Sequence, residues 1–504
     1  SCFTGLFCQV AQASADTSNI YSAIQDVVST LTGNAALDKA RLAARLQSFR
    51  ENLSRFGSKQ PAASDAPDAK VAEQLAGSLS AILEYAGAGI ETASSFRQDV
   101  EAYKQLSDKS SSDEQACKLR RRLTENFYSI YNLTLKKALT DSALPLPVRL
   151  FLTFGYVDDE LAGESNSACL CQLIDSPEGL SGEGVYTFFD WVKCIYEGKK
   201  QPSRNEFGED YVDYLHKQKA GGKLSEQELR DLSDNPMRKV EFELQNLFPT
   251  VNKITYGRVT TFCPLLTADN ILRDLSASYV KVDDIRSVLD RIRNIDYSVF
   301  YRETLNMDSP VAQKENIHVE CLPDFILMPN AGITWQEIEG RKRTTPSRMM
   351  ISIFHMEDLY TTTIRLVGDY RWEMCKRVQG ARWNDLTERS LTSEYFDYIQ
   401  FYKKNNELSP EAKERIRQSL MGAKNSFIRD YLLWIQLEST ASPRLNKIAR
   451  QIIFTYCPFS REVRQKVQSN PMYGELIRRH DVKCQQHLSH FNKLAQKLRN
   501  EGTQ

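Results

Sequence analysis

The sequence predicts a mainly α-helical protein, in which an N-terminal helical bundle or hairpin region precedes an α-rich α+β body with a small sheet. Apolar residues recur at helical spacing through most of the chain, and one segment, 317–328, is a clear strand candidate. The 504 residues are 41% hydrophobic and 26% charged, which is typical of a folded globular protein and excludes wholesale disorder.

The N-terminal region, residues 1–143, is expected to be almost wholly helical. Apolar stripes step by three and four positions, and polar linkers at 57–68 and 107–114 separate them. The stripes comprise Leu42, Leu46, Phe49, Leu53 and Phe56, then Val71, Leu75, Leu79, Ile82 and Leu83, then Leu119, Leu123, Phe127, Ile130 and Tyr131. Because a narrow stripe completes its burial against other helices, we predict that this region contacts a protein partner or a second copy.

The middle region, residues 144–310, is predicted to be a mixed, acidic domain. Residues 151–250 contain 19 acidic and 10 basic side chains, a local charge of −9. The segment 253–262 (KITYGRVTTF) is rich in β-branched residues and predicts a hairpin of two short strands. Helical spacing returns over 282–295.

The last region, residues 311–504, is predicted to be an α-rich, basic domain with a short strand pair. Its clearest strand segment is 317–328 (IHVECLPDFILM), in which Pro323 indicates either an edge strand or two short strands. From Arg348 onward the spacing is mostly helical. Residues 444–504 contain 12 basic and 4 acidic side chains, a local charge of +8, so the net charge of zero conceals an acidic middle and a basic C-terminal segment.

The cysteines and the apolar runs favour a cytoplasmic protein without membrane contacts. Eleven scattered cysteines form a poor disulfide framework and are typical of reduced thiols. No basic segment precedes an apolar core at the start, so no signal peptide is expected. The longest apolar runs fall far short of the roughly 20 residues that span a bilayer.

A basic loop, residues 340–348 (GRKRTTPSR), is the first candidate site. Arginine forks and hydroxyls hold phosphate or carboxylate groups, and the helix predicted to follow would add backbone donors at its N-terminus. The candidate anion-binding residues are Arg341, Lys342, Arg343, Thr344, Thr345 and Arg348. The alternative is a solvated surface loop, because no glycine-rich phosphate-binding motif accompanies these residues.

An acidic set is the second candidate, and it comprises Asp324, Glu337, Glu339, His355 and Asp358. On a strand Glu337 and Glu339 would share a face, and on a helix His355 and Asp358 would share one. Such groups could bind a divalent metal or perform acid–base chemistry. Because no HExxH or GxSxG motif is present, we expect neither a metal nor a cofactor, and the favoured interpretation is that these acids lie at ordinary strand ends and helix starts.

Two further clusters also allow a structural interpretation. Arg365, Arg371, Trp372, Lys376, Arg377, Arg382 and Trp383 mix cations with aromatic rings, which either bind nucleic acid or contact one another within a domain. Cys484, His487 and His490 offer metal-ligand types, but a buried thiol on the apolar stripe of the last helix is the favoured interpretation.

These observations leave three functional hypotheses. The first is a cytosolic helical interaction or regulatory protein of scaffold type. The second is an anion-binding module that holds nucleic acid or a phosphorylated ligand through the 341–348 loop and the basic C-terminal segment. The third, an enzyme built on the carboxylates between 324 and 358, is the least favoured by the sequence.

Overall fold

The computed structural model describes residues 78–107, 113–157, 181–182, 184–205, 207–257, 265–266, 280–305, 316–320, 322–328, 335–337, 347–353, 358–379, 383–387, 389–404, 409–411 and 422–501. These residues are mainly helical with a small sheet, which confirms the predicted fold class. They form two compact units: a first unit within 78–285 and 323–353, and a second unit within 286–322 and 358–501. The three consecutive domains remain a prediction, and the units divide the chain differently. No helix in the described ranges is long and apolar enough to cross a membrane.

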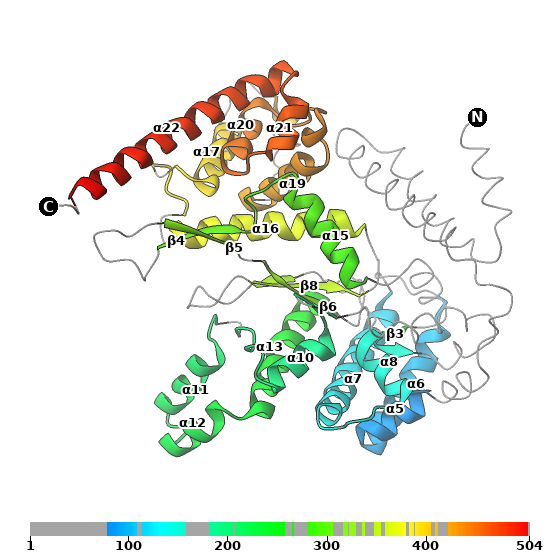
Figure 1. Cartoon of the computed structure of the whole chain (residues 1–504). Helices are drawn as coiled ribbons and strands as arrows, with labels where there is room; N and C mark the ends of the chain where they lie inside the picture. Colours follow the sequence, from blue (N-terminus) through cyan, green and yellow to red (C-terminus); the bar gives the residue numbers. More distant parts are fainter. Residues whose placement is uncertain are drawn as a thin grey trace, which may run out of the picture. The chain divides into compact units, whose positions relative to one another are not determined.

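The first unit has a layer of helices that lie side by side in Figure 1. They are α5 (Ser78–Ala86), α6 (Ile90–Lys104), α7 (Glu114–Ala138), α8 (Leu146–Phe154), α10 (Phe188–Tyr196) and α13 (Pro236–Gly257). Helices α11 (Tyr211–Ala220) and α12 (Glu226–Ser233) form a smaller pair around Tyr211 and Phe242. The predicted hairpin at 253–262 is wrong over its first half, since α13 continues through Gly257, and 258–262 lie outside the described residues.

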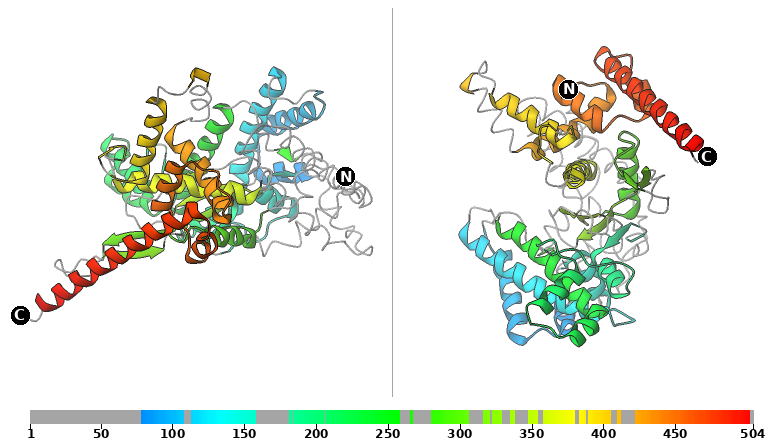
Figure 2. Two further views of the ribbon diagram at one scale, coloured as in Figure 1. Left: turned by 90° about the horizontal axis from the view of Figure 1, so that it is seen from above. Right: turned by 90° about the vertical axis from the view of Figure 1, so that its left-hand side faces the viewer.

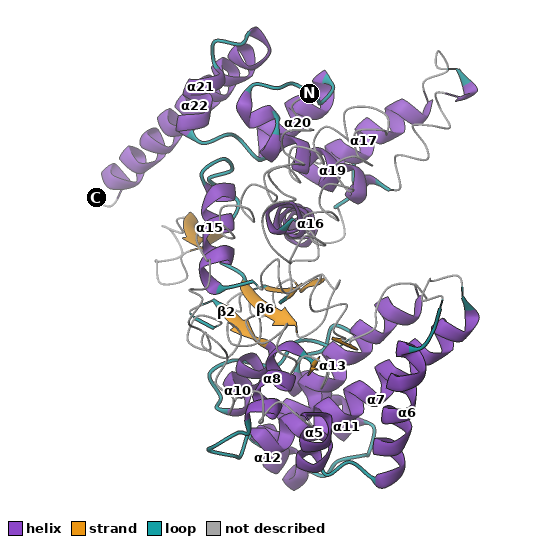
Figure 3. Ribbon diagram, turned by 90° about the vertical axis from the view of Figure 1, so that its right-hand side faces the viewer, coloured by secondary structure: helices purple, strands orange, loops and turns teal. Residues whose placement is uncertain are grey.

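The sheet of the first unit has the strand order β2–β6–β8–β7, with β7 antiparallel to the others. Its strands are β2 (Val185–Thr187), β6 (Asp324–Met328), β7 (Trp335–Glu337) and β8 (Arg348–Ser352). All five residues of β6 and of β8 are buried, as expected for central parallel strands. Helix α10 packs against β2 and β6 (Figure 3). A separate parallel pair joins β1 (Tyr156–Val157) to β3 (Leu265–Leu266).

The predicted helical stripes of the first unit are buried within its own core. Leu79, Ile82 and Leu83 on α5, and the stripe from Leu119 to Tyr131 on α7, belong to one cluster with α8, α10 and the sheet. The ring of Tyr131 contacts Phe127, Phe151 and Phe188, and its hydroxyl donates to the Leu152 carbonyl at 2.6 Å. These stripes therefore require no second chain. The stripe at 42–56 and the residues Val71 and Leu75 lie outside the described residues.

The predicted strand segment at 317–328 forms two short strands, which is one of the two predicted alternatives. Pro323 separates β5 (Asn316–Glu320) from β6, and the two strands enter different sheets. Strand β5 pairs antiparallel with β4 (Tyr301–Leu305) in the second unit, whereas β6 lies between β2 and β8. The edge-strand alternative is thus wrong for β6, because Pro323 precedes the strand and removes no donor from its ladder.

The second unit is built from helices, several of which pack around aromatic rings. They are α16 (Leu359–Gln379), α17 (Leu391–Lys404), α19 (Ala423–Gln436), the 3₁₀ turn η5 (Glu438–Thr440), α20 (Lys447–Tyr456), α21 (Arg461–Val467) and α22 (Pro471–Glu501). The division of the chain into two units falls within helix α15 (Val282–Arg293). Trp434 stacks on Phe459 at 3.9 Å between ring centroids, and Trp372 contacts Tyr395 and Phe427. Figure 2 shows α22 as one long helix whose C-terminal half extends past α20 and α21.

Helix α16 lies close to α19 at Gly368, where the backbone leaves little room for a methyl group. A Cβ added at Gly368 would lie 3.1 Å from Cδ1 of Tyr431, and the Tyr431 hydroxyl is held by Asp296 at 2.8 Å. The Gly368→Ala variant gains about 1 kcal/mol of helix propensity, but overpacking against a fixed ring costs about 1–3 kcal/mol. We expect a lower unfolding temperature in a thermal melt of the full chain. A higher one would show that Tyr431 can shift.

Candidate functional site

The basic loop at residues 340–348, the first candidate site, ends at the buried strand β8. Arg341, Lys342, Arg343, Thr344 and Thr345 lie outside the described residues, whereas Arg348 begins β8 and is 4% exposed. The expected helix after the loop is wrong, because the apolar residues from Met349 to Ile351 fill a central strand, and α16 begins only at Leu359. No helix N-terminus follows this loop, so that part of the argument for an anion site has no support.

The Arg348 side chain is held inside the first unit. Its Nη2 donates to the carbonyl of Gln201 at 2.8 Å, and its guanidinium lies 5.4 Å from the ring centroid of Trp191. The Trp191 indole in turn donates to Oε1 of Glu243 at 2.8 Å. Arg348 therefore belongs to a buried polar cluster, and anion binding by the rest of the loop stays a prediction.

The buried Glu243 carboxylate is the acidic partner in this cluster. It is fully buried and accepts hydrogen bonds from Trp191 and from both the hydroxyl and the backbone amide of Ser203. Burial raises the pKa of Glu243, although Arg348 and these donors act in the opposite direction. Glu243 could not be predicted from the sequence, since a single glutamate on a helix gives no signal of its burial.

Asp324, the first residue of the acidic set, makes a buried ion pair. Asp324 begins β6, is 5% exposed and pairs with Lys200 at 3.0 Å. Burial raises the pKa of Asp324, while Lys200 and Arg348 lower it. Across the sheet, Arg348 stands opposite Asp324 on one side and opposite Glu337 of β7 on the other. The register therefore places two acidic positions, one at the start of β6 and one at the end of β7, on either side of Arg348.

Asp358 is the other member of the acidic set whose side-chain contacts the structure describes. Asp358 belongs to the second unit and caps α16, because its Oδ2 accepts hydrogen bonds from the backbone amide of Thr361 at 2.9 Å and from its hydroxyl at 2.7 Å. Glu339 and His355 lie outside the described residues. Where the structure describes the chain, no group of three or more His, Cys, Asp or Glu side chains could hold a metal ion.

The mixed basic and aromatic segment forms contacts within the second unit. Arg371 is half-buried and pairs with Asp296, and Lys376 lies 4.7 Å from the ring centroid of Trp383. Trp372 is buried among aromatic rings. The intradomain interpretation is confirmed for these residues, whereas Arg382 and the side chain of Arg377 lie outside the described residues.

A cavity of about 450 Å³ lies between α17, α20 and α22, and its size is typical of small-molecule sites. Buried Tyr398, Ile452 and Phe454 provide its floor. Glu394 and Asp397 line it from α17, and Arg479, His480 and Lys483 line it from α22; we call these two sets the acidic wall and the basic wall. The remaining lining residues are Ile448, Gln451, Thr455 and Leu476.

His480 on the basic wall has a defined environment. Its ring meets Phe454 edge-on at 5.6 Å between centroids, and its Nε2 lies 3.2 Å from Nη1 of Arg464 and 3.4 Å from Sγ of Cys484. Burial lowers the pKa of His480, and Arg464 and Lys483 lower it further, against the opposing effect of Asp481. The neutral imidazole can therefore accept a hydrogen bond from the Arg464 guanidinium near neutral pH.

The position of Cys484 corrects one prediction. The thiol is exposed, whereas the stripe on the last helix predicted a buried one. The side chains of His487 and His490 lie outside the described residues. The contact of Cys484 with His480 four residues earlier follows helical spacing, which was a signal that the sequence did contain.

Basic side chains dominate the exposed surface of the C-terminal segment. Among the described residues of 444–504, nine basic side chains are exposed, against three acidic ones. The nine, which we call the basic surface, are Arg444, Lys447, Arg461, Lys466, Arg478, Arg479, Lys483, Lys493 and Lys497. The acidic ones are Glu462, Glu475 and Asp481. Of these, Glu475 pairs with both Arg478 and Arg479.

One family match covers the segment that contains both the cavity and the basic surface. A family model described as a domain of unknown function (DUF8509) matches residues 380–504, about a quarter of the chain. No curated protein and no solved structure matches the chain. The matched segment contains all the helices that line the cavity, α17, α20 and α22.

Proposed function

We propose that the chain is a helical interaction protein, and that it binds an acidic protein partner through the basic surface of residues 444–504. The observation that carries the proposal is the excess of nine exposed cations over three exposed acids. Charges of one sign on an accessible surface attract a partner of opposite sign and accelerate its association.

The burial of the N-terminal stripes supports this choice of surface. The stripes on α5 and α7 are covered inside the first unit, so the described part of residues 1–143 offers no apolar face that demands a partner. The exposed cations of the C-terminal segment, in contrast, face solvent. A partner surface in 1–77 remains a prediction from the sequence.

The alternative function is binding of nucleic acid or of a phosphorylated ligand. The same cations could neutralise phosphates, and binding would then weaken steeply with salt because counterions are released. The two functions differ in the probe that binds more tightly. An acidic polypeptide tests the first, and a single-stranded oligonucleotide of equal charge tests the second.

The test is fluorescence anisotropy of the full chain with labelled poly-L-glutamate, in a low-salt buffer. We expect binding that the triple variant Arg461→Gln, Lys466→Gln, Arg478→Gln weakens roughly tenfold, at about 0.5 kcal/mol for each exposed charge. These cations were chosen because none of them lines the cavity.

The matched control replaces three exposed cations of the first unit, Arg121, Lys193 and Lys223, with glutamine. This variant is expected to bind poly-L-glutamate as the original chain does. An equal loss in both triple variants, or no binding at low salt, would contradict the proposal. Tighter binding of the oligonucleotide than of poly-L-glutamate would favour the nucleic-acid alternative.

A further inference from the structure

The two charged walls of the cavity do not neutralise each other. In the parts of the chain that the structure describes, no ion pair joins Glu394 or Asp397 to Arg479 or Lys483. Arg479 instead pairs with Glu475 on its own helix at 2.7 Å, and the Tyr456 hydroxyl donates to Glu394. Asp397 and Lys483 are exposed at the rim, and neither makes an ion pair with a described residue.

We propose that this cavity binds a small zwitterion, whose ammonium group lies at the acidic wall and whose carboxylate or phosphate group lies at the basic wall. Charged groups of a ligand bind best where the protein presents the opposite charge with its own hydrogen-bonding capacity unspent. Asp397 has that capacity on one side, and Lys483 has it on the other.

The floor of the cavity fits the part of the ligand between its two charges. Ile452 and Phe454 are buried side chains at the floor, and Leu476 is half-buried beside them. Methylene groups of a ligand that cover this surface would leave water, which favours binding. Gln451 and Thr455 add neutral hydrogen-bonding groups from α20. This combination of an apolar floor with a few polar groups is typical of small-molecule sites.

The proposal can be tested separately from the proposed interaction function, although Arg479 and Lys483 belong to both the basic surface and the basic wall. The acidic-partner test alters Arg461, Lys466 and Arg478, which do not line the cavity. The zwitterion test alters Asp397 and Lys483, so each test can fail without the other. The thiol of Cys484 serves as a local reporter, because it is exposed and lies 3.4 Å from His480 at the basic wall.

The experiment measures alkylation of Cys484 by iodoacetamide in the full chain, read by peptide mass spectrometry. The probes are 4-aminobutyrate, 6-aminohexanoate, 8-aminooctanoate and phosphoethanolamine, with hexylamine and hexanoate as singly charged controls. At a probe concentration about ten times its dissociation constant, a zwitterion that binds should slow alkylation about tenfold. The amine and the acid alone should protect far less at the same concentration.

The charge variants decide whether both walls are used. Lys483→Asp and Asp397→Lys should each abolish protection, and the double variant should restore it, because a zwitterion can bind in the reverse direction. Asn492→Asp, an exposed change on the same helix outside both the cavity and the basic surface, should leave protection unchanged. Protection only by phosphoethanolamine would assign a phosphate at the basic wall, and protection only by aminocarboxylates a carboxylate.

Protection of Cys484 by hexanoate equal to that by 6-aminohexanoate would overturn the proposal, since the acidic wall would then have no role. No protection by any probe would overturn it as well. Thermal melts of each variant establish that the second unit remains folded. All the altered side chains are exposed, so we expect small changes in unfolding temperature.

Discussion

Replacing Asp296 with alanine is expected to lower the free energy of unfolding of the second unit by about 3–5 kcal/mol. The Asp296 carboxylate is fully buried and accepts hydrogen bonds from Nε of Arg371 at 3.0 Å and from the Tyr431 hydroxyl at 2.8 Å. Arg371 also donates to the Ser298 hydroxyl and to the Tyr456 carbonyl. The alanine variant leaves the Arg371 guanidinium inside the unit without its counterion. Removing one partner of a buried ion pair costs more free energy than replacing both, because an unpaired charge remains.

The measurement is urea unfolding of the full chain, with hydrogen exchange of α16 and α19 as the readout for the second unit. Asp290→Ala is the matched control, because Asp290 is exposed on α15, and we expect a change within about 0.5 kcal/mol. The double variant Asp296→Leu, Arg371→Met should recover part of the loss, since it leaves no unpaired charge. A loss below about 1 kcal/mol for Asp296→Ala would show that water reaches Arg371.

The sequence predicts local features of this fold but not long-range contacts such as the pair of Asp296 and Arg371. Helical stripes identified α5, α7 and the helical character of the second unit, because the period of 3.6 residues is local information. Pro323 separated β5 from β6 for an equally local reason. The pairing of Asp296 with Arg371 joins residues 75 positions apart, and no local pattern contains it.

The errors have a common physical origin. Residues 348–352 (RMMIS) have too few positions to distinguish a buried strand from the start of a helix, and only the neighbouring strands β6 and β7 determine the outcome. The residues 253–257 continue α13, because β-branched residues are tolerated in a helix when the preceding turns are already formed.

The site was partly accessible from the sequence. The basic charge of 444–504 was visible in the composition, and the structure places most of these cations at the surface. The cavity was not, since its walls come from α17, α20 and α22, and only their packing brings Asp397 and Lys483 to one opening. The loop at 341–348 was a candidate anion site because it contains four cations, but the last of them, Arg348, is buried and has a structural role.

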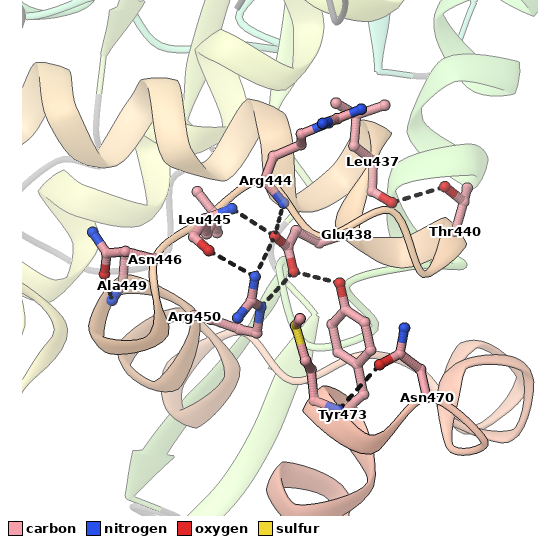
Figure 4. Close-up of polar contacts among 11 residues, drawn as sticks. Leu437, Glu438, Thr440, Arg444, Leu445, Asn446, Ala449, Arg450, Asn470 and Tyr473 are labelled. Carbon is pink, nitrogen blue, oxygen red and sulfur yellow. Dashed lines mark hydrogen bonds and ion pairs between the residues drawn. The ribbon is translucent and has the colours of Figure 1, made fainter. Parts of the chain in front are cut away.

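Replacing Glu438 with alanine is the second substitution with a large expected effect, again a loss of about 3–5 kcal/mol in the free energy of unfolding. Figure 4 shows that the buried carboxylate of Glu438 accepts hydrogen bonds from three parts of the second unit. Its Oε2 accepts from Nε of Arg450 on α20 at 2.7 Å and from the Tyr473 hydroxyl on α22 at 2.5 Å. Its Oε1 accepts from the backbone amides of Arg444 and Leu445 at 2.6 and 2.7 Å.

The pH dependence of stability separates this role from simple loss of packing. Burial raises the pKa of Glu438, but the donors from Arg450, Tyr473 and the two amides outweigh it, so the folded-state pKa lies below the ordinary value of 4.5. Its contribution is therefore fully present above pH 4.5 and is lost as the pH falls through the lower folded-state pKa. We expect the difference in unfolding free energy between the original chain and Glu438→Gln to be constant from pH 7 to about pH 5 and to shrink in more acidic buffer.

The position of Tyr473 connects this carboxylate to the cavity. Tyr473 is buried near the start of α22, and the basic wall begins less than two turns later on the same helix. Loss of the Glu438 anchor should therefore increase hydrogen exchange in the first turns of α22 and weaken the protection of Cys484 by 6-aminohexanoate. Tyr473→Phe removes only the hydroxyl and should cost about 1–3 kcal/mol, because the carboxylate keeps its other donors. If Glu438→Ala left the exchange of α22 unchanged, the helix would be held by its apolar contacts alone, and this polar cluster would serve only the loop before α20.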